Sequence, residues 1–155
     1  MNTVTVRPGI GIGPIDIGMA RSDVIAGATA AGLMVEDFRR GPGHGKPDLV
    51  INGQLFAYFD GAGRVEEVEV GLSADEEAEF AVVCLDLDLA ASYEAVLRRM
   101  SAISPVDDTD PEYPGTSAYP ELGLVLWADA KAEDLPDVTV ETILVRRPAP
   151  GQHRS

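Results

Sequence analysis

Cysteine and histidine are scarce in this chain, which has one of the former and two of the latter. A single cysteine excludes an intramolecular disulfide framework. Zinc sites need several cysteine or histidine ligands at short spacing, and neither His44 nor His153 has such a neighbour. We therefore predict no metal site and no cofactor. Cys84 lies in an apolar run, which favours a buried core thiol over a nucleophile.

Long apolar runs and a targeting segment are also missing. No run approaches the roughly 20 apolar residues that a membrane helix needs. Residues 1–8 lack the charged region followed by an apolar region that marks a secretory signal. On these grounds we expect a cytoplasmic protein of bacterial type with no membrane partner.

Basic residues are few, 12 against 26 acidic ones, and the net charge is −14. The imbalance is uneven, because residues 71–145 hold 17 acidic and 3 basic residues while residues 146–155 hold three arginines and no acid. Such a field repels phosphate backbones and attracts cationic partners. We therefore expect no nucleic-acid binding and a basic protein as partner. The alternative is that the charge only keeps the protein soluble.

Two stretches of the chain have the composition of a ligand site but lack the residue pattern that such a site needs. The glycine-rich stretch of residues 9–13 lacks the lysine of a phosphate-binding loop and the strand-turn-helix context of a dinucleotide site. The acidic stretch of residues 106–115 lacks the glycine and the terminal glutamate of an EF-hand at the required spacing. Neither pattern predicts a phosphate or calcium site.

What the chain does have is enough apolar material for a core, 45% of 155 residues, and a faint internal echo. Ile15–Ser22 and Leu85–Ser92 share an acid, an alanine and a serine at the same places, with apolar residues between them. Each is followed by strand-like residues. Two copies of a small helix-plus-sheet unit would bury a core that neither could build alone.

We therefore predict an α+β fold, in which two tandem helix-plus-meander repeats form an antiparallel sheet with the helices packed on one face. Residues 1–72 are the first repeat, residues 73–147 a divergent acidic second repeat that shares the core, and residues 148–155 a disordered tail. The oligomeric state is left open.

Periodicity and turn residues place the individual elements. Helices are expected at 21–31 and 91–102, and strands at 3–7, 49–51, 54–59, 65–70, 85–89, 122–128 and 138–146. Asn52 and Gly53 predict a tight hairpin turn. Gly27 weakens the first helix, a cost that a closely packed strand would explain. Asp88 or Ser92 is expected to cap the second helix, and Ile103 and Trp127 are expected in the core.

Two runs resemble known modules. Gly13–Val24 is similar to the "G-x-I-x-L-G-M-T-x-x-E-V" opening, and Tyr58–Val65 to the "F-D-x-x-G-R-V" hairpin, of SmpA/OmlA-type outer-membrane assembly lipoproteins and β-lactamase-inhibitor-protein-like domains. The chain departs from these modules at two positions. Ala20 stands where they have the helix-capping Thr, and in the second copy Asp88 stands at the position that Gly18 has in the first. The resemblance implies a protein-binding scaffold that uses its sheet face or loops, with no catalytic residue.

The leading functional hypothesis is a non-enzymatic acidic protein-binding protein, most specifically an inhibitor or immunity protein that neutralises a basic toxin or enzyme. Two histidines and no acid–base pair argue against catalysis. The predicted partner-binding residues lie in the acidic loop and just after it, with Trp127 as a further aromatic candidate. They are Asp107, Asp108, Asp110, Glu112, Tyr113 and Tyr119.

Two alternatives stay open. One is a small-ligand-binding α+β domain with a pocket between the sheet and the helices, for which His44, Tyr58 and Asp60 are the nearby polar groups. The other is a structural module in which the exposed edge of the meander pairs with another copy, unless a charge such as Glu66 blocks it.

Overall fold

The computed structural model describes residues 2–38, 48–72, 80–106, 116–128 and 138–148. This part of the chain forms two helices and eleven strands. The helices are α1 (Arg21–Ala30) and α2 (Tyr93–Met100). The strands are β1 (Asn2–Arg7), β2 (Gly11–Ile12), β3 (Ile15–Asp16), β4 (Val35–Phe38), β5 (Asp48–Ile51), β6 (Leu55–Phe59), β7 (Val65–Gly71), β8 (Phe80–Cys84), β9 (Thr116–Tyr119), β10 (Leu124–Trp127) and β11 (Thr142–Arg146).

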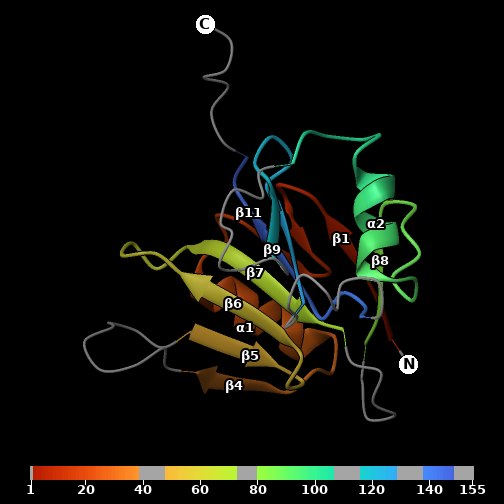
Figure 1. Ribbon diagram of the computed structural model, residues 1–155. Coiled ribbons are helices and arrows are strands. Elements are labelled where there is room, and N and C mark those ends of the chain that lie inside the picture. The colour runs from red at the N-terminus through yellow and green to blue at the C-terminus, as the bar shows by residue number, and fades with distance from the viewer. Residues whose placement is uncertain (1, 39–47, 73–79, 107–115, 129–137, 149–155) are drawn as a thin grey trace, which may run out of the picture.

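Seven strands form one antiparallel sheet in the order β4-β5-β6-β7-β11-β10-β9. Two meanders, β4 to β7 and β9 to β11, therefore meet through their last strands (Figure 1). The predicted meander of β5, β6 and β7 is confirmed. Its hairpin turn at Asn52 and Gly53 has φ angles of 51° and 69°, and these two positive values belong to a type I′ turn.

The other four strands form a small mixed sheet in the order β3-β2-β1-β8. β1 pairs in parallel with β8, so that Val4 lies opposite Val82, and antiparallel with β2. The predicted inward face of β1 is confirmed, since Val4 and Val6 are buried while Thr3 and Thr5 are exposed. β2 packs against β7 and β11, which brings the small sheet onto the large one.

Strand alternation buries one face of the seven-stranded sheet, which we call the inner face. Its central side chains are Leu49, Ile51, Leu55, Ala57, Val68, Val70, Leu124, Leu126, Ile143 and Val145. α1 covers this face behind β5 and β6 (Figure 1), with Val24 and Ala28 buried. α2 covers it at β9 and β10, where the buried Tyr93 hydroxyl donates to the Leu126 carbonyl at 3.0 Å.

The predicted helices are confirmed, with differences at their ends and in their packing. Ser92 caps α2 by accepting from the backbone N–H of Ala95 at 3.1 Å, whereas Ala20 begins α1 with no side-chain cap. The expectation for Gly27 was wrong, because an added Cβ there would meet nothing within 4 Å. None of the strands that the structure describes requires this glycine. Neither helix of the described residues is long and apolar enough to cross a membrane.

The internal echo is not reproduced position by position. Ala20 precedes the first residue of α1, while its counterpart Ala90 lies two residues before Ser92, the cap of α2. The residues before α1 include the short strand β3, whereas residues 85–92 form turns and bends. The structure therefore has an α+β architecture with one large antiparallel sheet and one small mixed sheet, and the echo does not mark equivalent backbone positions.

The expected strand at 85–89 was wrong. The preceding apolar run, Phe80–Cys84, is the strand β8, because it pairs with β1 along its whole length. Leu85 then adopts a φ of 53°, and the chain turns away. The two acids stabilise this turn: Asp88 accepts from the N–H of Ala90 at 3.1 Å, and Asp86 forms an ion pair with Arg99 of α2.

Three further expectations changed. Ile103 and Trp127, expected in the core, are 39% and 38% exposed. Glu66, expected to block pairing at an exposed sheet edge, lies on β7, which is paired on both sides. The edge strands of the large sheet are β4 and β9. β9 was not predicted. The expected disordered tail lies outside the described residues except for Pro148, which lies close to Gly9.

Candidate functional site: the outer face of the large sheet

The second face of the seven-stranded sheet, which we call the outer face, carries the side chains that alternate with the core. Most of them are half-buried or exposed, but Asp48, which alternates with Leu49 on β5, is only 2% exposed. They include Glu36, Val50, Phe56, Tyr58, Glu67, Glu69, Val125, Trp127, Leu144 and Arg146. Half-exposed apolar and aromatic side chains gathered on one sheet face are the usual material of a contact surface.

Strand register aligns six of these residues in one row across the sheet, and Glu36 of the edge strand β4 stands at one end of it, opposite Val50. Phe56 lies opposite Val50 on one side and Glu69 on the other. Leu144 lies opposite Glu69 and Val125 in the same way. We call the five residues beyond Glu36, from Val50 to Val125, the outer-face row. Glu69 is its only charged member, and apolar side chains flank it on both neighbouring strands.

The position of Glu69 among apolar neighbours changes the pKa of its carboxyl group. Burial among its neighbours raises the pKa of the Glu69 carboxyl; a hydrogen bond from Tyr58 opposes the shift, and the charge of Glu67 adds to it. The Tyr58 hydroxyl donates to Glu69 Oε2 at 3.4 Å, which is long for an O–H···O bond. Burial and the nearby carboxylates also raise the pKa of Tyr58.

Two aromatic rings stand beside this carboxylate. Phe56 and Tyr58 are two residues apart on β6 and therefore point to the same face. Their ring centroids are 6.4 Å apart and their planes differ by 9°. On β7, Glu67 faces Tyr58 on one side and Arg146 of β11 on the other. In the described ranges no ion pair involves Glu69.

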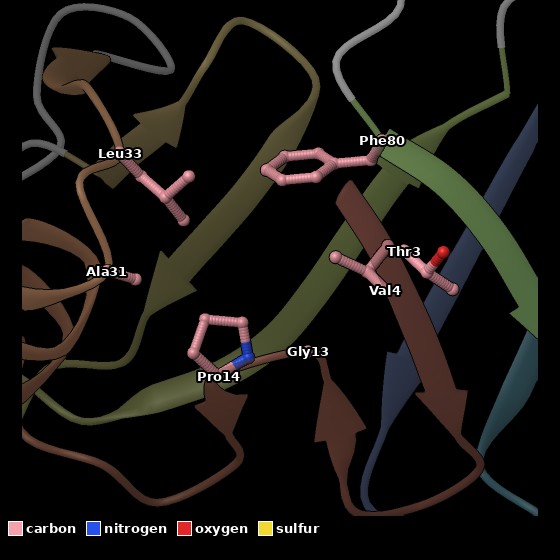
Figure 2. A pocket seen from close by; sticks show the side chains of 7 residues that line it. All are labelled: Thr3, Val4, Gly13, Pro14, Ala31, Leu33 and Phe80. Atoms are coloured by element: carbon pink, nitrogen blue, oxygen red, sulfur yellow. The ribbon is translucent and has the colours of Figure 1, made fainter. Parts of the chain in front are cut away.

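A hollow of about 480 Å³ lies elsewhere, between the end of α1 and the small sheet. Figure 2 shows Leu33, Phe80, Val4 and Pro14 around one space, with strands of the large sheet behind them. Its remaining lining residues are Thr3, Gly13 and Ala31. None of these side chains titrates, so the hollow can hold an apolar group but offers no acid or base for catalysis.

A second hollow of about 410 Å³ lies at the start of α1, beside the β6–β7 turn. Its charged lining residue, Arg21, donates to Asp37 at 2.6 Å. In that turn, Asp60 accepts from the N–H groups of Ala62 and Arg64 at 2.9 and 3.0 Å. The bond from Arg64 is the main reason why the pKa of Asp60 is lowered. These contacts close a turn rather than build a reactive site.

The residues predicted for partner binding fall into two groups. Asp107, Asp108, Asp110, Glu112 and Tyr113 lie outside the described residues. Tyr119 is 1% exposed and lies opposite Leu124 on the inner face, so its side chain belongs to the core and is not a surface anchor. Trp127, by contrast, lies on the outer face.

The polar groups named for a ligand pocket are not brought together. Tyr58 lies on the outer face, Asp60 in the β6–β7 turn, and neither lines a hollow described above. His44 lies outside the described residues. Cys84 is buried, and burial raises the pKa of its thiol to about 12. Within the described ranges, no group of three or more histidine, cysteine or acidic side chains could hold a metal ion.

Alternation with Val68 and Val70 places Glu67 and Glu69 on the face of the meander that is away from the core. Sequence analysis missed Phe56 and the outer-face row. Phe56 could have been placed on this face from the sequence, because Phe56 and Tyr58 alternate along β6 with the core residues Leu55 and Ala57. Comparison of this chain with protein-family models, with curated proteins and with solved structures finds no match.

Proposed function

We propose that this protein is a non-enzymatic, acidic protein-binding protein whose partner is a basic protein, and that its specific role is that of an inhibitor or immunity protein. One observation carries the proposal: an outer sheet face with a half-exposed apolar row around a carboxylate, on a chain of net charge −14. The apolar row supplies area that a partner can desolvate. The negative charge supplies steering toward a cationic partner.

The architecture supports a scaffold role. Each meander follows a helix in the chain, α1 before β4 to β7 and α2 before β9 to β11. We infer that the two halves repeat one helix-plus-meander plan, joined through β7 and β11, as in the modules that the sequence resembles. A sheet built in this way offers one broad face on rigid strands, which suits recognition of a folded partner.

The experiment is capture from a lysate of the native host at low and at high salt, with three immobilised proteins. Val125→Lys places a cation on the outer face, and Val83→Lys makes the same change on β8, where Val83 is 45% exposed on the small sheet. We expect the wild type and Val83→Lys to retain the same basic protein at low salt. High salt should release it, and Val125→Lys should bind it about tenfold more weakly.

Either of two results contradicts the proposal. One is that no basic protein is retained at low salt. The other is that both lysine variants retain the partner equally well, because the outer face would then have no part in the contact.

A second candidate function rests on the hollow of Figure 2. Its volume of about 480 Å³ falls within the range of small-molecule sites, and among the described residues that line it Thr3 alone has a polar side chain. A small apolar ligand in this space would raise the melting temperature of the wild type. Ala31→Trp, which fills the space from the end of α1, should remove that rise; a rise that persists would place the ligand elsewhere.

A further inference from the structure

Glu69 is unusual among the acids of the described residues because it lies within an apolar row. Its cross-strand neighbours are Phe56 and Leu144, so water reaches the carboxylate from fewer directions than at an ordinary surface position. Within the described part of the chain, its carboxylate accepts one hydrogen bond, the 3.4 Å contact from the Tyr58 hydroxyl. A partly desolvated carboxylate without a cation is costly, and a cation placed over it recovers that cost.

The neighbouring groups select the kind of cation. The rings of Phe56 and Tyr58 supply flat, electron-rich surface next to the carboxylate. A guanidinium group is planar, can donate two parallel N–H groups to a carboxylate and stacks on aromatic rings, and it is more weakly hydrated than an ammonium group. Glu67 adds a second negative charge, while Arg146 faces Glu67 across the strand pair. The arrangement therefore fits arginine better than lysine and repels anions.

We propose that Glu69, Phe56 and Tyr58 form the docking point for an arginine side chain of the basic partner. The inference rests on the proposed function, since it names the partner group that the outer face receives. The charge of this point complements a basic protein, and the apolar ends of the outer-face row extend the contact on both sides.

The test uses the whole chain and needs no identified partner. The probe is the blocked tripeptide acetyl-Gly-Arg-Gly-amide, titrated into isotopically labelled protein and followed by amide and aromatic NMR shifts. The matched probe replaces arginine by citrulline, which has nearly the same shape and no charge. We expect saturable shifts at Phe56, Tyr58 and Glu69 with the arginine peptide and at least tenfold weaker binding of the citrulline peptide.

Two variants complete the design. Glu69→Gln keeps the shape and removes the charge, so it should bind the arginine peptide at least tenfold more weakly. Glu94→Gln removes one carboxylate from the exposed side of α2, which changes the net charge equally, and it should bind like the wild type. Equal binding of the two peptides, or undiminished binding by Glu69→Gln, overturns the docking point.

The outcomes separate this inference from the proposed function. If the native-host partner binds the wild type and Glu69→Gln with equal dissociation constants, protein binding stands and the docking point fails. If the arginine peptide binds as expected but no basic protein is captured, the docking point stands and the proposed function fails. A doubled mass in solution that Glu69→Gln abolishes would make a second copy the occupant, and this overturns the assignment to a basic partner.

Discussion

Gln54 bonds both backbone groups of Phe80. Its side-chain Nε2 donates to the Phe80 carbonyl at 3.1 Å, and its Oε1 accepts from the Phe80 N–H at 3.0 Å. The same Nε2 donates to the carbonyl of Gly71 at 2.8 Å. Gln54 is 8% exposed. One side chain thus serves as a strand neighbour for β8 and joins the small sheet to the end of β7.

The first prediction follows from this bridge. Gln54→Met keeps the length of the side chain and removes all three hydrogen bonds, leaving backbone groups of Phe80 without that partner. We expect the free energy of unfolding to fall by about 2–3 kcal/mol. Urea unfolding followed by circular dichroism measures it. A fall below about 0.5 kcal/mol would mean that water replaces the side chain at no cost.

The second prediction concerns the pH dependence of stability at Glu69. Since burial raises the pKa of this carboxyl in the folded state, the folded protein holds its proton more tightly than the unfolded chain. The Glu69 carboxyl therefore lowers the free energy of unfolding by a growing amount as pH rises from its pKa in the unfolded chain through its higher pKa in the folded protein. We expect Glu69→Gln to gain stability over the wild type at pH 7 and to match it at about pH 3, below the usual glutamate range.

Urea unfolding of both proteins at the two pH values tests this sign. Glu94→Gln serves as the control, because Glu94 is exposed and pairs with Arg98 on the helix surface. A loss of stability in Glu69→Gln at pH 7 would show instead that the carboxylate is well solvated or well paired in the folded protein.

The third prediction compares two glycines. Gly27 lies in α1 with open space around it, so Gly27→Ala should raise the free energy of unfolding by about 0.5–1 kcal/mol. Gly123 has a φ of 70°, and a Cβ there would lie 2.1 Å from the Arg146 carbonyl oxygen. Gly123→Ala should therefore lower stability by about 2 kcal/mol or more. Thermal and urea unfolding of the pair measure both; changes of the same sign would contradict the backbone description.

The fourth prediction concerns the thiol of Cys84. It is fully buried, and burial raises its pKa to about 12, so the reactive thiolate is scarce at pH 8. Iodoacetamide should leave the native protein unmodified over an hour at pH 8 and alkylate it fully in 8 M urea. Mass spectrometry reads both. Rapid labelling of the native protein would place Cys84 at an accessible, reactive site.

Local patterns were sufficient for the first meander. Alternation in residues 54–70 and the Asn52-Gly53 turn act between neighbours in the chain, and both helices follow from the spacing of apolar residues, α2 also from its Ser92 cap. The small sheet was not predictable by such means. The pairing of β1 with β8 joins residues almost eighty positions apart, and the apolar run Phe80–Cys84 has no alternation that would distinguish a strand.

The candidate site was predictable only in part. The phase of β7 places Glu67 and Glu69 away from the core, and this is a local property. The outer-face row exists only because β7 pairs with β11 in one register, which sets Leu144 beside Glu69. Tyr119 was not placed in the core for a different reason: β9 was not predicted, and within that strand Tyr119 lies on the inner face opposite Leu124. Register between distant strands cannot be read from either strand alone.

The parallel pairing of β1 with β8 has a consequence for synthesis. A ribosome makes β1 and its hairpin partner β2 early, but the other neighbour of β1 does not exist until residue 84 has left the exit tunnel. Until then the backbone groups of β1 on the side that faces β8 have no strand to pair with. Contacts this distant in sequence also form slowly in a free chain. The small sheet is therefore completed late, and an interrupted translation product that ends before β8 would be prone to aggregate through β1.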